Sequence, residues 1–561
     1  MTEESPSTVS LEIPSAKAKA CVNCRRRKIK CDGERPKCGQ CLRSSSFQDC
    51  EYADDGPTRT QILEEQIAIL EARIEELEKP KELRSALVLQ NPYGGERRSA
   101  SLPALSRGGS PVHHLPLPHS EISSGPSSPL SGHTSSEGIP LVELEALTHN
   151  FLHHSSQFGF FLNIQNFREA AMGRSGQRPT AVLLDVVHLW AIHLSGSDEF
   201  AIHEASYLSR ALGTAVDALS GSHSLNTVLH SIQAEVLLTL YFLRNTRFLE
   251  GKYHLSAAVS LVISSGLHRI RSADSYAVSG PLGLAFRSLA APRDAIEENE
   301  RINAFWTVLT LNNCWTTADG SPSNISYTVP DARIDTPWPL DINTPSFHNQ
   351  ILPDLSIGTV TTFLANLPDT GTSVTALHAK AAILFEQASR LASQYRPNMT
   401  HEHLNQFYTS FNSIDALIGG FKLLLPTVHS HPTREMLVIH SLANVATIQL
   451  HNPFVVDIEA SRLHELAAAR AVVSDLGQLP MNDLVYIDPI MGTLFMATCQ
   501  VFMAELVRCR AHRPLGGPAP QEERSIMDGL ETVLAAMNVF APNCRLMDSQ
   551  LNAMRKMYHA L

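Results

Sequence analysis

Long apolar segments are missing from this sequence. In its 561 residues no apolar run reaches the roughly 18 residues that a helix needs to cross a bilayer. The first ten residues, MTEESPSTVS, are polar and acidic, without the basic and apolar regions of a secretory signal. We therefore expect an intracellular chain that does not associate with membranes and whose thiols stay reduced.

Recognisable catalytic constellations are missing as well. The segment HEHL at 401–404 is not the zinc-protease pattern H-E-x-x-H, because its second histidine comes two residues too early. No glycine-rich loop of the phosphate-binding kind precedes a predicted helix. Four cysteines are scattered on apolar helical faces, where we expect core thiols: Cys314, Cys499, Cys509 and Cys544. These absences predict that the protein is not an enzyme.

The remaining cysteines gather near the start of the chain. Within thirty residues they follow the spacing C-x2-C-x6-C-x6-C-x2-C-x8-C, at Cys21, Cys24, Cys31, Cys38, Cys41 and Cys50. In a reduced chain such clusters indicate metal ligands, and zinc takes four thiolates in a closed structural site. Two tetrahedral sites need eight ligands, so six thiolates suffice only if two sulfur atoms bridge both metals. No histidine falls inside the array, which excludes the two-cysteine, two-histidine finger.

Positive charge gathers in the same segment. From Lys17 to Arg43 the chain has ten Lys or Arg against Asp32 and Glu34, a formal +8. Because the whole chain carries −11, the remainder carries −19. A basic head on an acidic body indicates that the head alone meets a polyanion.

The array resembles the fungal binuclear zinc-cluster transcription factors, whose six-cysteine spacing and basic run it matches throughout. The resemblance implies two Zn²⁺ ions, one held by Cys21, Cys24, Cys31 and Cys38 and the other by Cys38, Cys41, Cys50 and Cys21. It also implies that Lys28 contacts the bases of a CGG triplet in double-stranded DNA, with Arg25, Arg27 and Lys30 nearer the phosphates. A helix starting near Cys24 would present a basic set to the major groove: Arg25, Arg26, Arg27, Lys28 and Lys30.

A dimerisation signal follows the array. After a linker at 53–60, the segment 61–79 has apolar residues spaced 4, 3, 4, 3, namely Leu63, Ile67, Leu70, Ile74 and Leu77. Isoleucine at a and leucine at d favour a parallel two-stranded coiled coil, so we expect a homodimer. The alternative is a single amphipathic helix packed on its own chain. Residues 91–138 are rich in Ser, Pro and Gly and predict a disordered linker.

From residue 140 to 561 the pattern predicts long helices separated by Pro, Gly and Ser turns, hence an all-α body. Helices are predicted at about 375–395, 433–450, 458–475, 484–509 and 522–540, and around three apolar segments: SIQAEVLLTLYFLRN, SAAVSLVISSGLHRI and ENERINAFWTVLTLNN. In the last segment Ile302, Phe305, Trp306 and Leu309 predict one buried face. These segments, with HSLANVATIQLHNPF, resemble the fungal transcription factor middle-homology domain over roughly 180–455. That resemblance implies a regulatory domain.

These observations predict a nuclear, homodimeric DNA-binding regulator of RNA polymerase II genes. Residues 17–52 form the zinc module, and the helical body meets transcription machinery or co-regulators and possible small-molecule effectors. One alternative is an interaction protein whose zinc module docks on a protein without base-specific recognition. The five basic residues between the second and third cysteines argue against it. A second alternative, an enzyme in the helical body with a DNA-tethering head, lacks a polar constellation to support it.

Overall fold

The chain divides into two compact units, Met1–Leu115 and Pro116–Leu561, in the computed structural model. The structure describes residues 20–35, 37–43, 50, 139–174, 178–218, 225–273, 289–327, 333–344, 347, 351–430, 432–481, 484–512 and 521–561. The predicted linkers, the 61–79 helix and its seam (Leu63, Ile67, Leu70, Ile74, Leu77) lie outside these residues. Their structure therefore stays a prediction.

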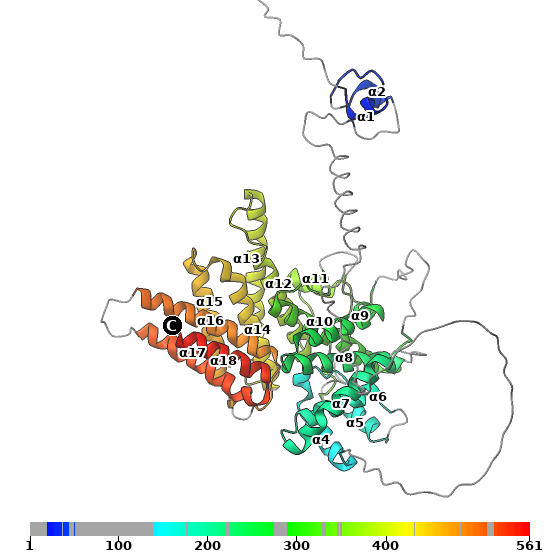
Figure 1. Cartoon of the computed structure of the whole chain (residues 1–561), viewed down its shortest axis with the longest axis vertical. Coiled ribbons are helices and arrows are strands. Elements are labelled where there is room, and N and C mark those ends of the chain that lie inside the picture. Colours follow the sequence, from blue (N-terminus) through cyan, green and yellow to red (C-terminus); the bar gives the residue numbers. More distant parts are fainter. Residues whose placement is uncertain are drawn as a thin grey trace, which may run out of the picture. The chain divides into compact units, whose positions relative to one another are not determined.

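The first unit contributes two short helices, α1 (Val22–Arg26) and α2 (Gly39–Leu42). The second unit is a helical body (Figure 1). Its α-helices are α4 (Leu141–His154), α5 (Ile164–Ala171), α6 (Ala181–His193), α7 (Asp198–Asp217), α8 (Leu225–Arg244), α9 (Phe248–Ser264), α10 (Ala295–Asp319), α11 (Thr359–Leu364), α12 (Val374–Ala392), α13 (His401–Leu424), α14 (Thr433–His451), α15 (Glu459–Gly477), α16 (Ile490–Ala511), α17 (Gln521–Phe540) and α18 (Arg545–His559). The 3-10 turns that lie wholly within the described residues are η2 (Ser155–Phe158), η3 (Leu267–Arg269), η6 (Asn452–Phe454) and η8 (Ala541–Asn543).

The described part of the body contains no β-strand, only one isolated bridge between Ser272 and Ser356. The predicted all-α body is therefore confirmed. Sequence analysis left several helices without a prediction, among them α7 and α13. Both mix apolar and polar residues along their length and lack the long apolar segments that marked the predicted core helices.

Local side-chain chemistry sets the ends of these helices. The Asp294 carboxylate accepts a hydrogen bond from the Glu297 amide at 2.8 Å and begins α10, and Gly320 ends it with a φ of 72°. Helix α9 ends at Ser264, and Gly266 follows it in the left-handed region with a φ of 74°. The helix predicted over 484–509 instead begins at Ile490, because Asp488 caps the Ile490 amide and Pro489 precedes the first turn.

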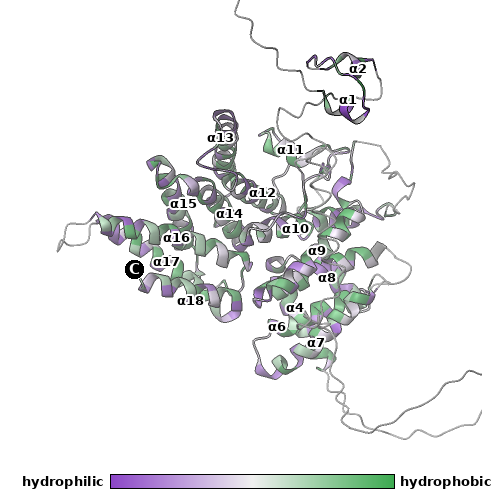
Figure 2. Cartoon of the chain, turned by 45° about the horizontal axis from the view of Figure 1, so that its top comes forward, coloured by the Kyte–Doolittle hydropathy of each residue, from purple (hydrophilic) through white to green (hydrophobic). Residues whose placement is uncertain are grey.

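The core of the body runs along α6, α8, α10, α12, α14 and α16. Helix α12 packs along both α10 and α14, and α8 packs along α6 and α9. Outer helices such as α17 and α18 carry hydrophobic and hydrophilic residues in turn (Figure 2), with their apolar side buried. The prediction of one buried face on α10 is too narrow. Ile302, Phe305, Trp306 and Leu309 are fully buried, but so are Ala304 and Val308 on the opposite side of the helix.

Helix α16 is the one described helix long and apolar enough to cross a membrane by length and composition. Two-thirds (67%) of its most apolar window is buried inside the body, as in the core helix of a folded domain. It contacts α14, α15, α17 and α18. Its apolar surface is therefore largely covered by its own chain.

Candidate zinc centre and nucleic-acid interface

The six clustered cysteines come together in two overlapping groups. Cys21, Cys24, Cys31 and Cys38 form one, and Cys21, Cys38, Cys41 and Cys50 form the other, with the sulfur atoms of each group within 4.8 Å of one another. Cys21 and Cys38 belong to both groups. This is the sharing that six ligands need to serve two tetrahedral metals, and that the family resemblance implies.

The sulfur spacing fits zinc. The Sγ atom of Cys38 lies 3.7 Å from that of Cys21 and 3.6 Å from that of Cys24, and Cys21 lies 3.8 Å from Cys41. A tetrahedron with Zn–S bonds of about 2.3 Å has edges of about 3.8 Å. The residues present therefore suit two Zn²⁺ ions, which neutralise and crosslink the thiolates.

The module is a repeat of one local fold. Cys21 caps α1, its Sγ accepting a hydrogen bond from the Cys24 amide at 3.4 Å, and Cys38 caps α2 in the same way through the Cys41 amide at 3.4 Å. Each C-x2-C pair thus places one sulfur at a helix N-terminus and the other within the first turn. Thiolates are favoured at this end of a helix dipole.

Burial makes a metal necessary for this arrangement. Burial raises the pKa of Cys24 to about 12, so without a bound metal this thiol keeps its proton at neutral pH. Burial acts on Cys38 too, but hydrogen bonds from the backbone and side chain of Cys41 outweigh it and lower the pKa of Cys38 to about 6. Ionising all six thiols in one small core therefore requires the positive charge of bound zinc.

One side chain ties the two halves together. Asp32, directly after the third cysteine, accepts hydrogen bonds from the amide of Glu34 at 3.3 Å and from the amide of Gly39 at 2.8 Å. A Cβ atom on Gly39 would lie only 2.6 Å from the Asp32 Oδ2 atom. Sequence analysis missed both residues. The spacing of Asp32 and Gly39, seven residues apart, matches no known motif, so their contact could not be predicted before the repeat is folded.

The basic segment differs from its predicted form. A helix starting near Cys24 and carrying the whole basic set is wrong in its limits, because α1 covers only Val22–Arg26. After Arg27 at the cap, Lys28 has a φ of 54°, in the left-handed region. Its amide donates to the Arg25 carbonyl at 3.1 Å, and the Ile29 amide donates to the Cys24 carbonyl at 3.1 Å.

This pair of hydrogen bonds is a Schellman motif, in which the left-handed position is usually glycine. Lys28 and Lys30 therefore lie beyond the helix, in a turn whose path the motif fixes. Arg25, Arg27, Lys28 and Lys30 are all exposed, whereas Cys21, Cys24, Cys38 and Cys41 are buried. The side chain of Arg26 lies outside the described atoms.

A third group with ligand chemistry lies in the body, where Asp415, His451 and His464 meet at α13, α14 and α15. Both ring nitrogens of His451 are already engaged, Nδ1 with Ser461 at 3.1 Å and Nε2 with Asp415 at 3.3 Å. The hydrogen bond from His451 also lowers the pKa of Asp415. These contacts account for the cluster as a polar link between helices around the buried His451.

Comparison with known proteins agrees with this geometry. The model of the fungal Zn(2)-Cys(6) binuclear cluster domain matches residues 19–59, and that of the fungal specific transcription factor domain matches 149–414. The chain belongs to the fungal binuclear zinc-cluster family. Both matched families are transcription regulators and not enzymes, which confirms the prediction for the class of this zinc-cluster protein.

Two curated relatives are named as transcriptional activators. The chain is 24% identical over 339 residues to the citrinin biosynthesis transcriptional activator mrl3 of Monascus ruber, covering 57% of this chain and 63% of the relative. It is equally similar to the citrinin biosynthesis transcriptional activator ctnR of Monascus purpureus, of which it covers 56%. The zinc-cluster protein thus spans less than two-thirds of either relative. No solved structure matches the chain.

Proposed function

We propose that this zinc-cluster protein is a nuclear, sequence-specific regulator of RNA polymerase II genes that recognises CGG triplets in double-stranded DNA. Residues 17–52 bind the DNA and 53–60 link them to a dimerising helix at 61–79. The linker 91–138 leads to the regulatory body at 140–561, which meets co-regulators or the transcription machinery. Two copies bind together, each placing one zinc module on one triplet.

The observation that carries the proposal is the separation of sulfur and charge in the first unit. Cys21, Cys24, Cys38 and Cys41 are buried, whereas Arg25 of α1 and the basic residues after the helix, Arg27, Lys28 and Lys30, are exposed. A short helix end with Lys and Arg is small enough to enter the major groove, where these side chains reach guanine O6 and N7. A module that only docked on a protein would not need this basic run.

Within the basic set, the proposal gives different residues different tasks. Lys28 contacts the bases, because it lies at the end of α1 in a turn fixed by two hydrogen bonds. Arg25, Arg26, Arg27 and Lys30 neutralise phosphates around it. Such contacts position the module and make its affinity depend on salt.

Dimerisation increases the sequence specificity, which a site of three base pairs cannot provide. A single triplet gives little specificity, while two triplets at a fixed distance form a longer site. In this proposal Leu63, Ile67, Leu70, Ile74 and Leu77 form the seam of the dimer.

The experiment compares a duplex carrying two CGG triplets with a scrambled duplex of the same composition, using the full zinc-loaded chain in fluorescence anisotropy. We expect the paired site to bind at least 100-fold more tightly, and the variant Ile67→Asp/Leu70→Asp to lose the advantage of the second triplet and sediment as a monomer. Equal binding of both duplexes, weakening steeply with salt, would leave only phosphate attraction. The protein-docking alternative would then be the better function.

A further inference from the structure

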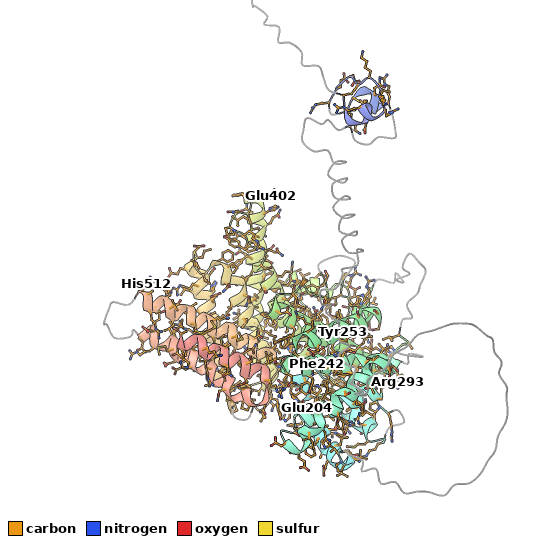
Figure 3. All side chains as sticks on the ribbon, in the orientation of Figure 1. Glu204, Phe242, Tyr253, Arg293, Glu402 and His512 are labelled. Atoms are coloured by element: carbon orange, nitrogen blue, oxygen red, sulfur yellow. The ribbon has the colours of Figure 1, made fainter. Side chains whose placement is uncertain are left out.

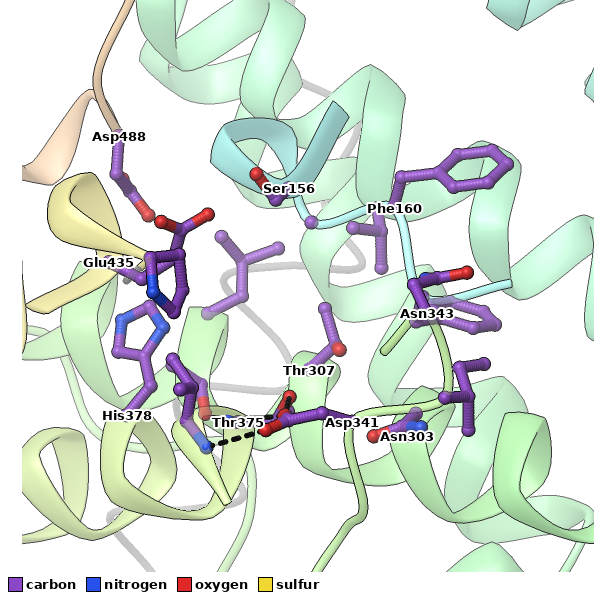
Figure 4. Close-up of a pocket in the computed structure, with 18 of the residues that line it drawn as sticks. Ser156, Phe160, Asn303, Thr307, Asp341, Asn343, Thr375, His378, Glu435 and Asp488 are labelled. Atoms are coloured by element: carbon purple, nitrogen blue, oxygen red, sulfur yellow. Dashed lines mark hydrogen bonds between the residues drawn. The ribbon is translucent and has the colours of Figure 1, made fainter. Parts of the chain in front are cut away.

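The helical body has a cavity of about 540 Å³ that is partly open to solvent and lined by residues far from the zinc module in sequence (Figure 4). Its walls come from η2, α8, α10, the segment 340–344, α12, α14 and the residues before α16. Known small-molecule sites have volumes of about 300–1,000 Å³. Because the lining spans residues 156 to 488, no local sequence pattern could have indicated it.

The charged groups of the lining have one sign. Asp341, Glu435 and Asp488 face the cavity, and neither Lys nor Arg is among its described lining residues. Asp341 is engaged at the start of α12, where it accepts hydrogen bonds from the amides of Val374 at 3.0 Å and Thr375 at 3.2 Å. The other two carboxylates have capacity to spare.

Glu435 and Asp488 lie on one side of the cavity. Figure 4 shows them with His378 there, and Phe160 and Asn343 across from them. One oxygen of Asp488 accepts from the Ile490 amide at 2.9 Å, and the carboxylate of Glu435 has no hydrogen bond or ion pair among the described residues. Burial raises the pKa of Asp488 to about 6, so this carboxylate is still mostly ionised at pH 7.

Further polar atoms of the lining are unpartnered acceptors or neutral groups. The Asn303 amide donates to the Leu340 carbonyl at 3.1 Å, which leaves its Oδ1 atom shielded from solvent and without a described partner. Burial lowers the pKa of His378 to about 4, so its ring is neutral at pH 7, and its Nε2 atom is also unpartnered among the described residues. The rest of the wall is largely apolar, with Phe161, Trp315 and Leu340.

We infer that this cavity binds a small organic amine, its ammonium group between Glu435 and Asp488 and its apolar part against the aromatic wall. Carboxylates with free acceptor capacity favour a cationic donor, and aromatic faces add cation–π attraction. An anionic ligand would meet uncompensated negative charge. A bare metal ion fits less well, because these carboxylates and His378 are not among the described groups whose ligand atoms lie within 4.8 Å of one another.

The role of the amine as an effector of transcription rests on the proposed function, whereas the binding itself does not. The test therefore measures binding by the full zinc-loaded chain in isothermal titration calorimetry, with tryptamine, tryptophol and indole-3-acetate as probes. They share an indole body and differ in ending as an amine, an alcohol or an acid. We expect tryptamine to bind at least tenfold more tightly than indole-3-acetate, with tryptophol between them.

The variants Glu435→Gln and Asp488→Asn should each weaken tryptamine binding at least tenfold. The matched control is Glu402→Gln, which removes a carboxylate at the exposed outer end of α13 (Figure 3) and should leave binding unchanged. The double variant Glu435→Gln/Asp488→Asn should bind tryptophol at least as tightly as tryptamine. This positive signal shows that the variant body still folds and holds its cavity.

No binding of tryptamine at millimolar concentration would overturn the inference, as would binding that Glu435→Gln and Asp488→Asn leave unchanged. A preference for indole-3-acetate would overturn it too. Anisotropy with the paired-CGG duplex, run on the same samples, keeps this outcome separate from a failure of the proposed function.

Discussion

The Ile29 amide donates a hydrogen bond to the Cys24 carbonyl oxygen at 3.1 Å, and so closes a turn around Lys28, whose φ is 54°. A non-glycine residue in this region costs roughly 1 kcal/mol or more. The zinc module therefore has a lysine at a position whose backbone conformation favours glycine. Strain held at one basic residue points to a function for that side chain.

This relationship predicts that the fold and DNA recognition can be separated at residue 28. In Lys28→Gly, relief of the strain and the added flexibility of glycine offset each other to within about 1 kcal/mol. Zinc retention against a competing chelator should therefore stay at the wild-type level. Affinity for the paired-CGG duplex should fall by roughly 10- to 100-fold, the value of about 1–3 kcal/mol for a lost base contact.

Lys28→Ala is the companion variant, because it removes the ammonium group and keeps the strained backbone. It should lose DNA affinity as Lys28→Gly does, without the relief of strain. If Lys28→Gly instead released zinc readily, residue 28 would serve the fold, and its assignment to base contact would be wrong.

A second prediction concerns the link between the two halves of the module. In Gly39→Ala the new methyl group would come within 2.6 Å of the Asp32 carboxylate and displace it from the Gly39 amide. Loss of this charge-assisted hydrogen bond, which is exposed, should cost about 1 kcal/mol. A chelator titration should show zinc released about fivefold more readily.

Gly213→Ala provides the control, because a Cβ atom at this position in α7 meets no atom within 4 Å. It should leave zinc retention unchanged and stabilise the body by roughly 0.5–1 kcal/mol. Equal zinc retention in Gly39→Ala and wild type would show that Asp32 does not hold the halves together.

A third prediction concerns pH and the ring of His378. Burial lowers its pKa from 6.5 to about 4 in the folded body, so between these values the unfolded chain binds the extra proton. Its contribution to stability is complete above about pH 6.5 and is lost as the pH falls toward 4. His378→Gln removes this dependence, so its free energy of unfolding relative to wild type should rise by about 2 kcal/mol between pH 7 and pH 5.

Urea unfolding of both chains at the two pH values, followed by circular dichroism, measures this difference. Comparing variant with wild type cancels carboxyl groups of opposite effect, such as Glu300, whose pKa burial raises to about 7. His149→Gln, at an exposed position on α4, is the matched control. A difference that did not change with pH would mean that solvent in the cavity reaches the ring.

The sequence predicted the parts that depend on short-range pattern. The cysteine spacing predicts two overlapping metal groups, since each C-x2-C pair folds into the same helical turn around Cys21 or Cys38. Apolar periodicity predicts α12 and α14 to within a few residues, whereas α8 starts well before its apolar segment and α10 continues well past its own. Their apolar content is high enough to mark them as core helices.

The remainder depends on contacts between distant residues. Lys28 lies outside the helix because two backbone hydrogen bonds end α1 before it. The sequence could not predict this end, because the left-handed position holds a lysine and not the usual glycine. Asp32 and Gly39 meet only when both halves are folded. Glu435 and Asp488 come from different elements, and periodicity along one helix cannot show that they face a shared cavity.

The most direct test of the central claim is selection of random duplex DNA by the full zinc-loaded chain, followed by sequencing, with Lys28→Gly in parallel. We predict that wild type enriches pairs of CGG triplets at one spacing and orientation, and that Lys28→Gly, equally loaded with zinc, does not. Enrichment of the same pairs by both chains would contradict base recognition by Lys28. Enrichment of no sequence by wild type would contradict the account of the zinc module as a sequence-specific DNA reader.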